Sequence, residues 1–121
     1  MRMELLLAIA VLLAASCIGE RVVPRERPTE VPSDASWAGG ADGGSWIRCE
    51  VREARQANYC TVYHENSGDI IAEGWFVLRD TGRAAPLADL TYSAFDGYEI
   101  HLEGGDVLTP VELKTGLMPG Q

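Results

Sequence analysis

The sequence predicts an all-β fold: a small antiparallel meander of about six strands forming a partial barrel or sandwich, preceded by a signal segment and a flexible tether. In most of the strands expected between residues 46 and 113, apolar and polar side chains alternate with the period of two that is typical of half-buried strands. Turn signals rich in glycine and aspartate separate these runs at short intervals. No helical repeat follows the apolar segment at the N-terminus.

Each expected strand has its own justification in the pattern. The six strands are expected at residues 46–52, 58–64, 70–79, 90–95, 98–103 and 107–113. The run at 70–79 is apolar on both faces, which indicates a strand that is central or covered twice. Asp96-Gly97 is a strong hairpin signal between the fourth and fifth strands. Pro110 interrupts the last strand and therefore favours an edge position.

The N-terminal segment has the features of a secretory signal peptide. Arg2 supplies a basic start, residues 5–15 are apolar throughout, and small residues occupy Ala14 and Ser16. The apolar stretch is shorter than the roughly 20 residues that a transmembrane helix needs. We therefore expect residues 1–16 to be a signal peptide, which is removed on export.

The residues that end this segment predict a lipid anchor. Ala14-Ala15-Ser16-Cys17 resembles the bacterial lipobox, in which the cysteine becomes the lipid-modified first residue of the mature chain. The resemblance implies a lipoprotein that carries several acyl chains such as palmitate on Cys17, which together give stable attachment. Ile18 follows the cysteine, where an aspartate would indicate the inner membrane, so the outer membrane is favoured if the cell has two. Simple secretion is the alternative.

The domain boundaries follow from composition. Residues 17–45, after the lipidated cysteine, are rich in proline, glycine and charge, and we expect a tether. Trp37 is out of character there and is expected to dock onto the domain or onto a partner. The β-domain is expected at 46–113, and residues 114–121 are expected to be a tail.

The remaining cysteines, Cys49 and Cys60, are predicted to form a disulfide, because an exported chain meets an oxidising compartment. If they face each other in an antiparallel hairpin, paired residues have numbers that sum to 109, and Ile47 faces Val62 on the same side. The disulfide and the apolar alternation thus agree on one register. A metal-binding or redox pair is the alternative, but the spacing is not that of a C-x-x-C motif.

Charge and motifs narrow the classes of function. The net charge is −8, which argues against nucleic acid and anionic lipid headgroups as ligands and permits a basic partner. The chain has no G-x-S-x-G, no H-E-x-x-H and no phosphate-binding glycine loop, so we expect a protein that is not an enzyme and needs no cofactor.

Two groups of side chains are candidates for function. The predicted register places four apolar and aromatic residues on the face away from the disulfide: Tyr59, Tyr63, Ile71 and Trp75. They form an interaction surface if exposed, and a second core if covered. The other candidates are His64, at a strand end, and the set Glu99, His101 and Glu103 on one strand face, which suit a metal or acid–base chemistry; a solvated face is the alternative.

These observations together predict an envelope lipoprotein whose tethered β-domain is a non-enzymatic binding module for an envelope protein. In outline the chain is similar to the small lysozyme-inhibitor lipoproteins, which are anchored, disulfide-bearing β-domains. The likeness covers architecture only and implies no site residues. The alternatives are a secreted metal-binding protein or small enzyme that uses His64, His101 and nearby carboxylates, and a structural envelope protein with no discrete ligand.

Overall fold

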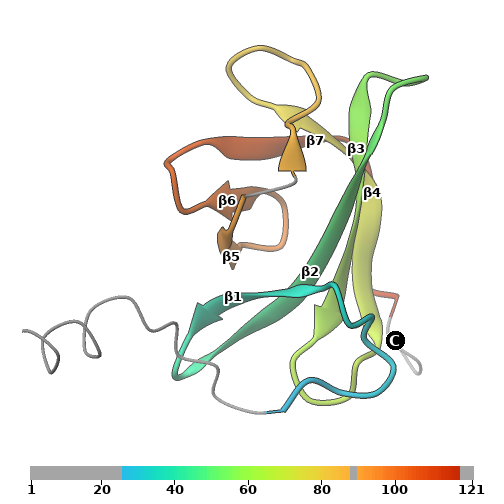
Figure 1. Cartoon of the computed structure of the whole chain (residues 1–121). Coiled ribbons are helices and arrows are strands. Elements are labelled where there is room, and N and C mark those ends of the chain that lie inside the picture. Colours follow the sequence, from blue (N-terminus) through green and yellow to red (C-terminus); the bar gives the residue numbers. More distant parts are fainter. Residues whose placement is uncertain (1–25, 88–89, 118–121) are drawn as a thin grey trace, which may run out of the picture.

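Seven antiparallel strands form one sheet in the computed structural model, which describes residues 26–87 and 90–117 (Figure 1). The strands are β1 (Ser36–Gly40), β2 (Gly43–Arg52), β3 (Ala57–His64), β4 (Ile70–Leu78), β5 (Tyr92–Phe95), β6 (Ile100–Leu102) and β7 (Val107–Thr115). The all-β prediction is confirmed. Among the described residues there is no helix of the length and apolarity needed to cross a membrane.

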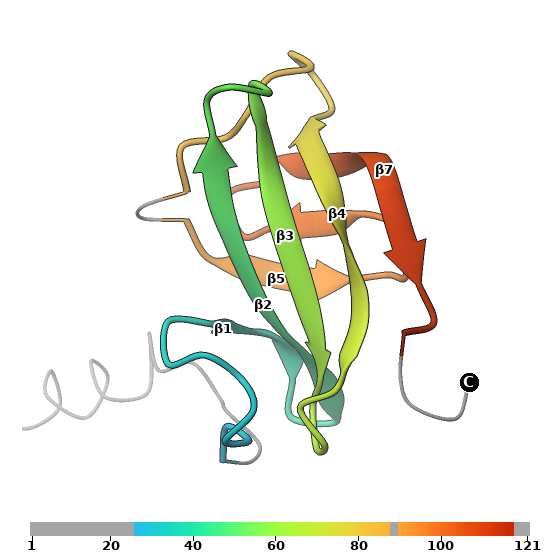
Figure 2. The ribbon, with the colours of Figure 1, turned by 90° about the vertical axis from the view of Figure 1, so that its right-hand side faces the viewer.

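The sheet curls into a nearly closed barrel. Its strand order is β1-β2-β3-β4-β7-β6-β5, and the two edge strands, β1 and β5, lie close to each other. Figure 2 shows the long strands β2, β3 and β4 in front, with β5 and β6 crossing behind them. The order departs from a simple meander at one point, because β7 and not β5 pairs with β4.

The inward faces of the strands enclose the main core. Its largest fully buried apolar side chains are Phe76, Ile47, Ile100, Leu108 and Val62. They come from β2, β3, β4, β6 and β7, and the same core includes Ala38 of β1 and Tyr92 of β5, so it joins the two edges of the sheet. Burial of such side chains is the dominant favourable contribution to folding.

The predicted register of the first long hairpin is confirmed. In every pair of β2 with β3 the residue numbers sum to 109, including Cys49 with Cys60 and Ile47 with Val62. The predicted disulfide links Cys49 and Cys60, whose Cα atoms are 4.0 Å apart.

The domain begins earlier and ends later than the sequence indicated. The tether expected for residues 17–45 is corrected over its described part, because residues 36–40 form β1 and β2 starts at Gly43. The glycines that suggested a loose segment instead allow two strands to approach closely: a Cβ added to Gly44 would lie 2.1 Å from the carbonyl oxygen of Ala38. At the other end, β7 continues to Thr115, into the expected tail. The predicted signal peptide, Cys17 and residues 18–25 and 118–121 lie outside the described residues.

Two β-bulges set the side-chain orientation in the middle of the sheet. One lies between Val62 and Tyr63 against β4, and the other between Trp75 and Phe76 against β7. The edge position expected from Pro110 is corrected in part, since β7 pairs with strands on both sides. Pro110 itself lies beyond Leu108, the last residue of β7 that pairs with β6, so its missing N–H costs no hydrogen bond on that side.

Candidate functional site

The outward face of β2, β3, β4 and β7 carries side chains in three rows that cross the strands. The register gives the rows as Trp46, Tyr63 and Ile70; Arg48, Thr61, Glu73 and Lys114; and Glu50, Tyr59, Trp75 and Glu112. In the third row two aromatic rings lie between two carboxylates. This row is on the side of the sheet opposite the disulfide, as the alternation predicted.

Tyr59 and Trp75 form the aromatic pair at the centre of the candidate site. Their ring centroids are 5.0 Å apart and the rings are inclined by 73°, an edge-to-face arrangement. Both side chains are half-buried, and a small groove of about 90 Å³ beside them is lined by Glu73, Glu112 and Lys114. Burial and the nearby Glu73 carboxylate raise the pKa of the Tyr59 phenol above its ordinary value.

Two arginines from the β2–β3 hairpin lie over these rings. The guanidinium carbon of Arg55 is 4.2 Å from the Trp75 ring centroid, and that of Arg52 is 5.9 Å from the Tyr59 centroid. Both distances are within the range of a cation–π contact.

Each of these arginines also pairs with a carboxylate of the third row. Arg55 approaches Glu112 at 3.4 Å, and Arg52 donates to Glu50. The hydrogen bond from Arg52 lowers the pKa of the Glu50 carboxyl. The site therefore consists of two units, each made of a ring, a guanidinium and a carboxylate.

The other two residues of the predicted interaction surface lie elsewhere. Tyr63 is only 9% exposed and packs with Val31, Trp37 and Trp46 in a second, smaller core. Ile71 is half-buried and packs against the main core. The bulge after Val62 is the reason for Ile71, because it pairs Tyr63 with Ile70 and leaves Ile71 out of the outward row.

A segment before β1, residues 26–35, covers the second core, and we call it the strap. Two successive turns shape it, with the N–H of Val31 donating to Pro28 and that of Ala35 to Pro32. Val31 is 1% exposed. Asp34 accepts two hydrogen bonds of 3.0 Å from Nε of Arg48 on β2. The strap thus covers the first row of the outward face and reaches the second row at Arg48.

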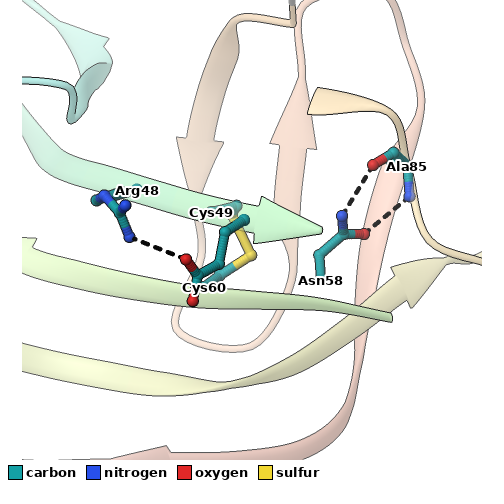
Figure 3. The surroundings of a disulfide bond; sticks show 6 residues. Arg48, Cys49, Asn58, Cys60 and Ala85 are labelled. Carbon is teal, nitrogen blue, oxygen red and sulfur yellow. Dashed lines mark hydrogen bonds and ion pairs between the residues drawn. A yellow bond between two sulfur atoms is a disulfide. The ribbon is translucent and has the colours of Figure 1, made fainter. Parts of the chain in front are cut away.

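Figure 3 shows how the hairpin that carries the site is tied to the rest of the barrel. The disulfide joins β2 to β3 at the pair next to Glu50 and Tyr59 of the third row, on the opposite face of the sheet. Asn58, fully buried, donates through Nδ2 to the carbonyl oxygen of Ala85 and accepts through Oδ1 from its N–H, both at 2.8 Å. These bonds fix the loop after β4 against β3.

The two histidines serve separate turns. Nδ1 of His64 accepts from the backbone N–H groups of Asn66 and Ser67. Nε2 of His101 lies 3.1 Å from Oδ2 of Asp96, whose other oxygen accepts from two backbone N–H groups of the β5–β6 turn. The hydrogen bond from the backbone of Glu99 is the main cause of the lowered pKa of Asp96.

Of the predicted set of Glu99, His101 and Glu103, the structure brings two members together. Glu99, His101 and Asp96 have ligand atoms within 4.8 Å of one another. Glu103 instead bonds to Thr91 at 2.9 Å.

A larger depression of about 530 Å³ lies where β2 turns into β3. It is lined by Val51, Glu53, Gln56, Arg83 and Ala84, and so it has no aromatic side chain. It lacks the combination of ring and paired charge that marks the Tyr59–Trp75 site.

The charged members of the site were not predicted from the sequence. The register that paired Cys49 with Cys60 also places Glu50 opposite Tyr59, so the position of Glu50 beside this ring could have been predicted. Arg55 lies in the turn, and Glu112 follows Val111, the extra residue of the β7 bulge; strand alternation predicts neither position. Comparison with protein-family models, curated proteins and solved structures found no match to this chain.

Proposed function

We propose that this protein is an envelope lipoprotein whose disulfide-linked β-domain is a non-enzymatic binding module, with the outward face around Tyr59 and Trp75 as its binding surface. The observation that carries the proposal is the half-buried aromatic pair on the outward face of the sheet, with an arginine over each ring. Tyrosine, tryptophan and arginine are the residues that most often dominate binding energy in protein interfaces.

The packing of the molecule supports a role of this face beyond stability. The main core is enclosed by the inward faces of the strands, and the strap already buries the aromatic residues of the first row. The third row adds an edge-to-face ring pair on β3 and β4, which are adjacent inner strands of the sheet. Half-buried rings held by strands on both sides offer contact area at a low cost in conformational entropy.

Export and membrane anchoring are tested separately from the binding surface. The lipobox-like residues before Cys17 support export and anchoring. Intact mass of the chain recovered from the membrane fraction should exceed that of the unmodified mature polypeptide by the mass of the acyl groups. A Cys17→Ser variant should lose both the extra mass and membrane attachment. An unmodified wild-type chain in the soluble fraction would contradict the anchor.

The binding surface is tested by capture of partners from envelope extracts. Trp75→Ala removes the ring at the centre of the site, and Tyr98→Ala removes an aromatic ring that is 58% exposed in the β5–β6 turn. We expect Trp75→Ala to abolish capture of the partner and Tyr98→Ala to preserve it. Equal capture by both variants would exclude this face.

A second candidate function, metal binding, rests on the grouping of Asp96, Glu99 and His101. The carboxylate and imidazole ligands suit zinc or copper. Calorimetric titration with zinc, copper and calcium tests it, and heat that disappears in a His101→Ala variant would favour this function over the first.

A further inference from the structure

We propose that the Tyr59–Trp75 face recognises an arginine side chain of its partner, and that Arg52 and Arg55 occupy the same place until the partner binds. This inference rests on the proposed function, because it assumes that this face is the binding surface. The partner is thus a segment of protein that carries exposed arginine.

The protein's own contacts define the chemistry of the site. Arg55 lies 4.2 Å above the Trp75 ring and 3.4 Å from the carboxylate of Glu112. A planar guanidinium is therefore already held between a ring and a carboxylate, the two groups that attract it most. The guanidinium of a partner would make the same two contacts.

The protein's own arginines, Arg52 and Arg55, are exposed enough to move away from the two rings. The side chains of Arg52 and Arg55 are 53% and 49% exposed, and that of Glu112 is 63% exposed. Ion pairs with this exposure contribute little to stability, because water and salt screen them. A partner that binds several contacts at once can therefore displace them at a low cost.

Charge favours a basic partner over an acidic one. The chain has a net charge of −8, and three carboxylates, Glu50, Glu73 and Glu112, surround the ring pair. The three rows themselves contain two cationic side chains, Arg48 and Lys114. Arg48 is paired with Asp34, so Lys114 alone remains to offset the carboxylates once Arg52 and Arg55 have moved away. The site freed of its own arginines is thus a negatively charged aromatic surface.

The test uses the purified full chain and a short blocked peptide with two arginines separated by glycines. Its control is the same peptide with citrulline, which has nearly the shape of arginine but no charge. Binding is followed by the NMR shift of the Trp75 indole N–H. We expect the arginine peptide to shift this signal in a salt-dependent manner and the citrulline peptide to leave it unchanged.

The matched variants test whether Arg55 competes with the partner. Arg55→Gln frees the Trp75 ring, and Arg83→Gln makes the same change in charge in the other depression. If Arg55 covers the ring for most of the time, its removal should tighten peptide binding by about 3- to 10-fold. Arg83→Gln should change the affinity less than twofold.

The outcomes separate this inference from the proposed function. Equal binding of the two peptides, or an Arg55→Gln variant that binds no tighter than Arg83→Gln, would overturn the inference. If neither peptide binds while Trp75→Ala still abolishes capture of the envelope partner, the proposed binding face is retained and its preference for arginine is rejected. If Trp75→Ala leaves capture intact, the proposed function falls as well.

Discussion

Replacing Asn58 tests how the β2–β3 hairpin is held to the rest of the barrel. Its side chain makes two hydrogen bonds of 2.8 Å to the backbone of Ala85, and the two residues are 0% and 1% exposed. In Asn58→Ala, the N–H and the carbonyl of Ala85 both lose their partner in a place that water does not reach. Each such group costs about 1–3 kcal/mol, so we expect a loss of about 2–6 kcal/mol. This is a large share of the roughly 5–15 kcal/mol that holds a domain folded.

The assay is urea unfolding followed by tryptophan fluorescence, with thermal unfolding as a second measure. The melting temperature should fall by about 10 °C or more. A loss below about 0.5 kcal/mol, the usual effect of a surface substitution, would refute the reasoning. It would mean that the loop at Ala85 finds other partners at no cost.

An Asn58→Asp variant adds a pH signature to the same experiment. The introduced carboxylate keeps the acceptor for the N–H of Ala85 but turns a second negative oxygen toward its carbonyl. The folded state should therefore favour the protonated form and raise the carboxyl pKa above its ordinary value of about 3.9. A raised pKa gives stability that is present below the unfolded value and is lost as pH rises. The deficit relative to wild type should thus be smaller at pH 3 than at pH 7, and a deficit independent of pH would contradict the assignment.

Three further predictions concern the frame around the site. Replacing Cys49 and Cys60 together by serine should cost about 3 kcal/mol in urea unfolding, because the unfolded chain gains freedom; no difference from the oxidised wild type would argue against the link. Gly74→Ala should lower the free energy of unfolding by about 1–3 kcal/mol, because its Cβ would lie 2.0 Å from the carbonyl oxygen of Glu112. Gly104→Ala is the control: a Cβ there meets nothing within 4 Å, so this variant should have the stability of the wild type in the same assay. Burial raises the pKa of Tyr92 to about 12. The stability that its neutral phenol contributes is therefore complete below pH 10 and is lost between pH 10 and 12. Tyr92→Phe should flatten this part of the curve of stability against pH, and an unchanged slope would contradict the burial of the phenol.

The fold was predictable where two independent patterns agreed. For the β2–β3 hairpin, the cysteine pair and the alternation of Ile47 and Val62 required the same register, and the structure has it. Where only composition was available, the prediction failed. Gly39 and Gly44 read as a loose segment, although the lack of a side chain is what lets β1 approach β2.

The candidate site was half predictable for a similar reason. Alternation placed Tyr59 and Trp75 on one face, and they are a contacting pair. It cannot count across an inserted residue, and so it did not predict that the bulge after Val62 turns Ile71 away from that face. Tyr63 stays on the outward face, but Val31 of the strap packs over it. The role of the strap was also hidden, because Val31 lies alone among charged and proline residues and only the folded chain gives it apolar neighbours.

Cross-linking in intact cells tests the central claim, that the outward face around Tyr59 and Trp75 is the binding surface, most directly. A photoreactive amino acid replaces Thr61, which lies in the row beside the aromatic pair, and in a second strain it replaces the exposed Tyr98 on the β5–β6 turn. We predict a discrete adduct with an envelope protein from position 61 that is lost when Trp75→Ala is added, and no such adduct from position 98. No adduct from position 61, or the same adduct from both positions, would contradict the account.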